Sequence, residues 1–138
     1  KEIAVLDPVF NQSPYAISIL DTFKKYNFTG TLSLQCRAET LSDAFLEAAS
    51  KLDVVLELGL QTIHKDEEVA IQRRNNIHKF EQVLSKIRDL GIKHEVSVIF
   101  GLPTALRRPG GLKKLRESYR NNCHLFSPRS ELGVPSYV

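Results

Sequence analysis

The sequence predicts an α/β fold in which parallel β/α units form part of an open barrel. Short apolar segments near residues 2–7, 31–37, 53–60 and 94–100 alternate with segments of helical periodicity. Such alternation is typical of parallel sheets with crossover helices. The last three segments each place apolar side chains on one face and polar side chains on the other. An open sheet with helices on both faces would be apolar on both sides, so the pattern favours a barrel wall with helices only outside.

The segment at residues 53–60 shows the clearest difference between its two faces. Side chains alternate along a strand, so one face holds only aliphatic residues: Val54, Leu56, Leu58 and Leu60. The other face is mixed and carries Val55, Glu57, Gly59 and Gln61. A closed eight-stranded barrel fills its interior with branched apolar side chains. The carboxylate, the missing side chain at Gly59 and the amide instead predict a wider barrel whose inner face binds a polar ligand.

The neighbouring strands repeat this pattern. Apolar positions 32, 34 and 36 alternate with Ser33, Gln35 and Arg37, and positions 96, 98 and 100 alternate with Glu95, Ser97, Ile99 and Gly101. Ligands of parallel barrels bind at the carboxyl ends of the strands. We therefore expect one cavity lined by Gln35, Arg37, Glu57, Gln61, Ser97 and Gly101. An antiparallel sheet with one solvated face would show the same alternation, but the helical segments between the strands argue against it.

Capping residues mark the predicted helices in chain order. Ser13-Pro14 is expected to start the first helix, Thr40 or Ser42 the second, and Asn75 or Asn76 a longer one that Gly91 ends. Each helix carries an apolar stripe; the longest stripe consists of Ile77, Phe80, Val83, Leu84, Ile87 and Leu90.

Composition places few limits on function. The chain has 138 residues, of which 42% are hydrophobic and 25% charged, as in ordinary globular domains. No apolar run reaches the roughly 20 residues of a membrane span, and we expect a cytoplasmic protein without a membrane partner. Two distant cysteines and four histidines show no metal-ligand spacing, so no residue is assigned to a metal. The chain lacks Met and opens inside a predicted strand, so we expect a fragment of a longer protein.

The charge is uneven along the chain. Residues 1–104 contain 12 Lys and Arg against 14 Asp and Glu, whereas residues 105–138 contain 7 against 2. We therefore expect a core at 1–104 and an atypical, basic, poorly ordered tail at 105–138.

Three phrases resemble the core domain of the radical S-adenosylmethionine (SAM) superfamily, most closely its members fused to cobalamin-binding domains. They are DPVFN at residues 7–11, LELGLQT at 56–62 with QRRNN at 72–76, and VSVIFGLP at 96–103. The resemblance covers residues 1–104 and implies a partial (β/α)6, TIM-like barrel. It implies an enzyme that cleaves SAM reductively to a 5'-deoxyadenosyl radical. The implied cofactors are SAM, a [4Fe–4S] cluster and, in the cobalamin-fused members, cobalamin. The CxxxCxxC segment that holds the cluster in the family is missing here, which implies cluster ligands outside this sequence and an inactive chain on its own.

The resemblance also implies roles for individual residues. Gln61 matches a glutamine that contacts SAM, Arg73 a basic residue placed for the methionyl carboxylate, and Ser97 a polar residue that reaches the ribose. The remaining implied cofactor contacts are Gln35, Arg37 and Glu57 on the polar faces, and Asp7 and Asn11 in the loop that receives the SAM amino group. That loop lacks the glycine-rich segment of many relatives. The substrate and the catalytic residues are not implied.

Other interpretations stay open at this point. A TIM-type lyase would need a Schiff-base lysine at a strand end, and no predicted strand ends in lysine. A non-catalytic binding module could use the basic tail to meet an acidic partner, although nucleic acid is not expected because no recognition motif is present. A degenerate fragment without function is the third alternative.

Glu57 could also serve only as an ion-pair partner of Arg37. The expected partners are otherwise a small-molecule cofactor, an unknown substrate and the rest of the parent polypeptide.

Overall fold

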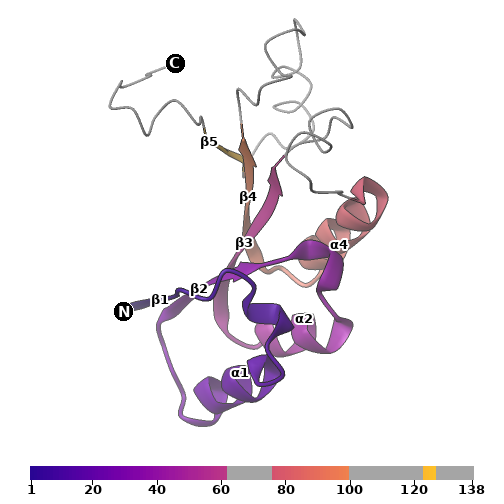
Figure 1. Cartoon of the computed structure of the whole chain (residues 1–138). Coiled ribbons are helices and arrows are strands. Elements are labelled where there is room, and N and C mark those ends of the chain that lie inside the picture. Colours follow the sequence, from indigo (N-terminus) through magenta and orange to yellow (C-terminus); the bar gives the residue numbers. More distant parts are fainter. Residues whose placement is uncertain (62–75, 100–122, 127–138) are drawn as a thin grey trace, which may run out of the picture. The chain divides into compact units, whose positions relative to one another are not determined.

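The computed structural model describes residues 1–61, 76–99 and 123–126 (Figure 1). The chain divides into two compact units. The first unit comprises residues 1–59 and 76–95, and the second comprises residues 60–75 and 96–138.

Parallel strands form the sheet of the first unit, as the sequence predicts. The strands β1 (Glu2–Val5), β2 (Thr31–Cys36), β3 (Asp53–Gln61) and β4 (Lys93–Ile99) lie in the order β1-β2-β3-β4. The first unit contains β3 up to Gly59 and β4 up to Glu95, and the remaining residues of both strands belong to the second unit. Strand β1 pairs in parallel with β2, and β2 pairs in parallel with β3, so that Val5 lies opposite Leu34 and Gln35 lies opposite Glu57. These bounds differ from the predicted ones by at most two residues, which confirms the α/β class with parallel β/α units.

The second unit contains a strand that the sequence pattern does not predict. Strand β5 (Cys123–Phe126) pairs in parallel with the carboxyl-terminal part of β4, with Val96 opposite Cys123. A segment of four residues is too short to show a period, and its partner is distant in sequence. Its pairing is therefore decided by tertiary contacts.

The helices of the first unit begin and end close to the predicted caps. They are α1 (Ala16–Lys25), α2 (Asp43–Ala49) and α4 (Ile77–Asp89), with short 3₁₀ turns η1 (Phe10–Gln12) and η2 (Ala38–Thr40). Ser42 Oγ accepts a hydrogen bond from the Phe45 N–H, and Asn76 Oδ1 accepts one from the Lys79 N–H at 3.0 Å. Gly91 adopts a φ of +66°, which glycine tolerates at a helix end.

Helix α1 begins two residues later than Ser13-Pro14 predicts. The Ser13 carbonyl accepts from the Ala16 N–H at 3.1 Å, and Ser13 Oγ accepts from the Tyr15 N–H at 3.3 Å. Because these bonds close a turn over residues 13–15, the first helical residue is Ala16.

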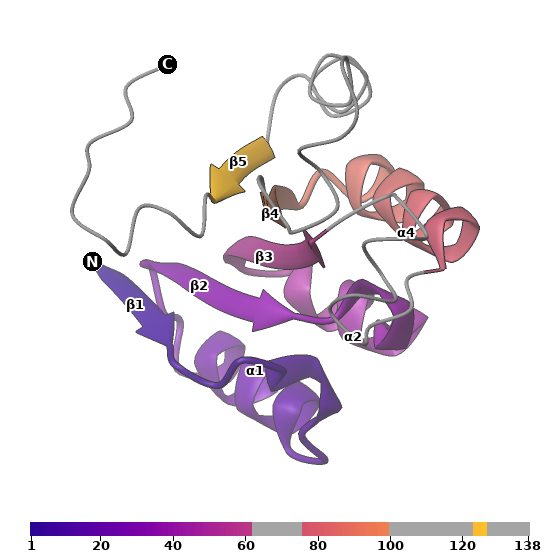
Figure 2. The ribbon, with the colours of Figure 1, turned by 45° about the horizontal axis from the view of Figure 1, so that its top comes forward.

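The apolar core lies between the sheet and the helices. Leu32 and Leu34 of β2 and Leu56 and Leu58 of β3 are at most 1% exposed, and they occupy the face that the alternation predicts. Phe45, Phe80 and Ile87 of the helices are at most 2% exposed. In Figure 2 the three labelled helices gather on one side of β1–β3. Each fully buried aliphatic side chain stabilises the fold by about 1.5–3 kcal/mol, so this face accounts for much of the stability.

A carboxylate joins three strands at their amino ends. Asp53 of β3 accepts a hydrogen bond from the Thr31 hydroxyl of β2 at 2.7 Å and one from the Lys93 ammonium of β4 at 2.8 Å. The Lys93 bond, followed by the Thr31 bond, holds the pKa of Asp53 below its usual value. These bonds therefore lie at the amino ends of the strands, away from the carboxyl ends where we expect the site.

Among the helices that the structure describes, none is long and apolar enough to cross a membrane.

In the first unit, the backbone of Gly30 lies too close to its neighbours to leave room for a side chain. A Cβ at Gly30 would overlap the Lys1 carbonyl oxygen and the Phe28 ring. The Lys1 oxygen also accepts a hydrogen bond from the Thr31 N–H at 2.9 Å. We therefore expect Gly30→Ala to lower the free energy of unfolding by about 1–3 kcal/mol in urea titrations.

Gly59→Ala is the matched control for Gly30→Ala. No described atom lies within 4 Å of the position that a Cβ would take there. We expect its stability to stay within about 1 kcal/mol of the wild type. Equal losses in the two variants would contradict this assignment of close approach to Gly30.

Candidate functional site

The candidate site is the face of β2 and β3 that lies opposite the helices. Ser33 and Glu57 are half-buried on this face, and Gln35 is exposed. The Ser33 hydroxyl donates to Glu57 Oε1 at 2.5 Å. Gln35 lies directly opposite Glu57 in the register of the two parallel strands, and neighbouring strands of a sheet are about 4.8 Å apart. The structure thus places two of the sequence-predicted site residues, Gln35 and Glu57, side by side, and adds Ser33, which was not predicted as a site residue.

Glu57 keeps hydrogen-bonding capacity for a ligand. A carboxylate accepts about four hydrogen bonds through its two oxygens, and Ser33 occupies one position on Oε1. Two residues further along β3, Gly59 leaves open space, because no described atom lies within 4 Å of the place where a side-chain carbon would stand. A held carboxylate beside a missing side chain suits a ligand with hydroxyl or ammonium donors.

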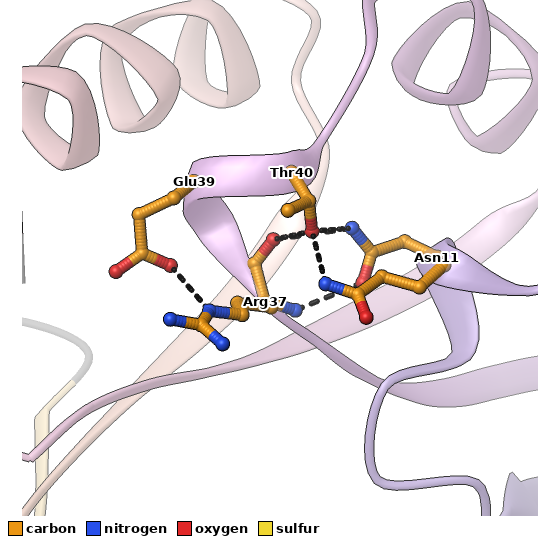
Figure 3. Close-up of polar contacts among 5 residues, drawn as sticks. Asn11, Arg37, Glu39 and Thr40 are labelled. Atoms are coloured by element: carbon orange, nitrogen blue, oxygen red, sulfur yellow. Dashed lines mark hydrogen bonds and ion pairs between the residues drawn. The ribbon is translucent and has the colours of Figure 1, made fainter. Parts of the chain in front are cut away.

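The carboxyl end of β2 is held by a side chain from the loop after β1 (Figure 3). Asn11 Oδ1 accepts from the Arg37 N–H at 2.9 Å, and Asn11 Nδ2 donates to the Arg37 carbonyl at 3.1 Å. Strand β1 ends at Val5, so the side-chain amide of Asn11 takes the place that a peptide group of a neighbouring strand would occupy. Nδ2 also donates to Thr40 Oγ1 at 3.0 Å, which links the loop to η2.

Phe10 anchors the same loop in the core. Its side chain is 3% exposed, and its ring meets Phe45 of α2 edge to face, with centroids 6.2 Å apart. Sequence reasoning missed this anchor and the bonds of Asn11 to Arg37. The available signal was an asparagine in a loop after a strand, because its amide readily replaces a backbone group.

Asp7 has a local partner as well. Its Oδ1 accepts from the Val9 N–H at 2.9 Å, which closes a turn at the start of the loop. The structure therefore gives both loop residues, Asp7 and Asn11, bonds that shape the backbone. Their contact with a cofactor stays a prediction.

The alternative ion pair between Arg37 and Glu57 is wrong. Arg37 Nε instead lies 3.4 Å from Glu39 Oε2, while Glu57 accepts from Ser33. The reason is that the turn of η2 brings the side chain of Glu39, two residues after Arg37, close to the guanidinium. Arg37 is 43% exposed at its side chain, so part of it faces solvent.

The remaining predicted residues belong to the second unit. Ser97 is a half-buried residue of β4. Gln61 is the last residue of β3, and its side chain lies outside the described part of the chain. Arg73 and Gly101 lie wholly outside the described residues, so their roles stay predictions.

The described residues do not fit an iron–sulfur cluster. Cluster ligation needs several thiolates, and the chain has two cysteines, of which Cys36 is 4% exposed on the apolar face of β2. Burial raises the pKa of the Cys36 thiol to about 12. Among the residues that the structure describes, no three His, Cys, Asp or Glu side chains gather to hold a metal ion.

Sequence comparison does not identify the chain. No protein-family model matches it, and no curated protein sequence matches it.

Solved structures share its fold. The chain aligns with a radical SAM methyltransferase, TsrM from Kitasatospora setae, solved with cobalamin and a [4Fe–4S] cluster bound. The TM-score is 0.71 and the identity 13%, over 91% of this chain and 27% of TsrM. TsrM bound to tryptophan and a SAM analogue aligns with a TM-score of 0.72 at 14% identity, over 89% of this chain and 26% of TsrM.

A second protein of this fold binds a peptide. The structure of anSMEcpe with AdoMet, which is SAM, and a peptide named Kp18Cys aligns with a TM-score of 0.62 at 10% identity. The alignment covers 91% of this chain and 37% of anSMEcpe. At these identities the comparisons show the fold alone: the chain has the α/β fold of part of these enzymes. It spans about a quarter of the length of TsrM.

The buried thiol provides a chemical test of the strand phase. A thiol reacts through its thiolate, and the raised pKa of Cys36 leaves very little thiolate at pH 8. We expect iodoacetamide to modify Cys36 at least about a hundredfold more slowly in the folded chain than in urea, as followed by peptide mass spectrometry. Comparable rates in the two states would place Cys36 on the solvated face and reverse the assigned phase.

Proposed function

We propose that this chain is the SAM-binding core of a radical SAM enzyme and acts as part of a longer protein. The observation that carries the proposal is the polar face of β2 and β3, where the Ser33–Glu57 pair lies beside the open space at Gly59. The shared fold with TsrM supports it, since that protein binds a SAM analogue.

The residues of this face suit the donors of SAM. The ribose hydroxyls and the amino group of SAM are hydrogen-bond donors, and Glu57 retains acceptor positions for them. Gly59 allows a ligand to approach the strand backbone. The resemblance adds Gln61, Arg73, Ser97, Gln35 and Arg37 as further contacts. A guanidinium such as that of Arg73 can bind the methionyl carboxylate through two parallel hydrogen bonds.

The remaining cofactors would come from elsewhere in the protein. A [4Fe–4S] cluster would supply one electron for the reductive cleavage of SAM into methionine and a 5'-deoxyadenosyl radical. Two cysteines, one of them buried, cannot hold that cluster here, so we assign its ligands to another segment. TsrM binds cobalamin, and together with the resemblance to cobalamin-fused members this supports a cobalamin domain in the parent protein. The reducing cytoplasm suits such chemistry.

Adjacent arginines offer a matched test of SAM recognition. We expect the chain to bind SAM in calorimetric titration, and Arg73→Ala to weaken binding about tenfold or more, because a charge-assisted bond is lost. Arg74→Ala removes the same charge one position later and should change the affinity less than about threefold. Absence of SAM binding to the wild-type chain would overturn the proposed function, and equal effects of the two substitutions would remove only Arg73 from the site.

Cluster assembly should fail on this chain. After anaerobic reconstitution with iron and sulfide, we expect well below one iron bound per chain and no reductive cleavage of SAM, because the thiolates are lacking. Iron and sulfide analysis with detection of 5'-deoxyadenosine tests this. A stoichiometric cluster would show that other residues ligate it.

A further inference from the structure

We propose that Arg37 binds the carboxylate of a ligand on the polar face, and that Asn11 is its positioning residue. The inference rests on the proposed function, since it concerns the same face of the sheet. It differs from the sequence-based expectation, in which Asn11 itself meets the cofactor.

Side chains bond both backbone groups of Arg37, the residue that follows β2. Asn11 bonds both its N–H, at 2.9 Å, and its carbonyl, at 3.1 Å, and the Thr40 hydroxyl donates to the same carbonyl at 3.0 Å. The Gln12 side chain in turn donates to Thr40 Oγ1 at 3.2 Å. Figure 3 shows the side chains of Asn11 and Thr40 at the backbone of Arg37, which follows β2. These bonds hold one position at the edge where parallel sheets bind ligands.

Among the residues that the structure describes, the guanidinium of Arg37 is bonded only through Nε. Glu39 Oε2 lies 3.4 Å from Nε, which is long for a charged hydrogen bond. Glu39 is 14% exposed at its side chain and Arg37 is 43% exposed, so the acid is covered while the guanidinium reaches solvent. Within the described residues, the contact of Arg37 with Glu39 runs through Nε and not through the Nη atoms. Glu39 thus orients one edge of the guanidinium and leaves the Nη edge for a second anion.

A carboxylate fits this free edge. Two parallel N–H donors match the two oxygens of a carboxylate, which is the usual bidentate geometry of arginine. The preformed Glu39 contact reduces the side-chain entropy that such binding would lose. Two sources of the carboxylate are compatible with the site: the methionyl group of SAM, and a carboxylate of the substrate if Arg73 holds SAM.

The experiment follows the Arg37 Nε–H resonance by NMR, assigned through its loss in Arg37→Gln. The chain is titrated with SAM, with decarboxylated SAM, and with acetate in the presence of saturating SAM. If SAM supplies the carboxylate, the wild type binds SAM about 10- to 100-fold more tightly than decarboxylated SAM, and Arg37→Gln loses that preference. If the substrate supplies it, SAM affinity is unchanged in Arg37→Gln, but acetate shifts the Arg37 resonance of the SAM-bound wild type.

The control is Arg88→Gln, which removes the same charge from the exposed face of α4. It should behave as the wild type in the titrations with SAM, with decarboxylated SAM and with acetate. If Arg37→Gln matches this control and acetate leaves the Arg37 resonance unmoved, the proposal is wrong. This failure differs from that of the proposed function, which is a wild-type chain that does not bind SAM.

A double-mutant cycle tests the positioning role of Asn11. We expect Asn11→Ala to reduce the carboxylate response several-fold and to have no further effect on it in the Arg37→Gln background, because the two residues act as one unit. Asn11→Asp keeps the acceptor for the Arg37 N–H but loses the donor, so it should retain part of the response. Additive effects of Asn11→Ala and Arg37→Gln on the carboxylate response would show that Asn11 only stabilises the fold.

Discussion

Burial of one aliphatic face of the sheet is the constraint on which this structure depends. Leu32, Leu34, Leu56 and Leu58 are almost completely excluded from water on the side of the helices. Because side chains alternate along a strand, burial of these positions places Ser33, Gln35 and Glu57 on the opposite face. The polar face is therefore a geometric consequence of the core, and a shift of one residue would destroy both faces together.

The two ends of the strands are stabilised by different means. At the amino ends, the Asp53 carboxylate bonds side chains of two neighbouring strands in an exposed position. At the carboxyl end of β2, a neutral side-chain amide bonds the backbone itself. An exposed ion pair stabilises little and leaves side chains free to move, whereas backbone bonds hold one conformation. The more precise attachment lies at the edge where parallel α/β proteins bind ligands.

Polar groups on the candidate face are supported by neighbours before any ligand binds. Glu57 has the Ser33 hydroxyl and Arg37 has the covered carboxylate of Glu39, so each charged group is oriented by one bond and keeps further capacity. Such preorganisation reduces the entropy lost on binding. It agrees with a site that recognises a polar ligand with hydrogen-bond donors and a carboxylate group.

The sequence by itself determined the class of fold, the phase of β2 and β3, and the caps of two helices to within two candidate residues each. These features follow from local chemistry: a period of two residues assigns the faces of β2 and β3, and the side chains of Ser42 and Asn76 bond backbone groups three residues away. Only the tertiary structure decided the partner of Arg37, the role of Asn11 and the pairing of β5. Each of these depends on which polar groups a turn or a crossover brings within hydrogen-bonding distance, about 3 Å. Neither the periodicity nor the composition of the sequence carries that information.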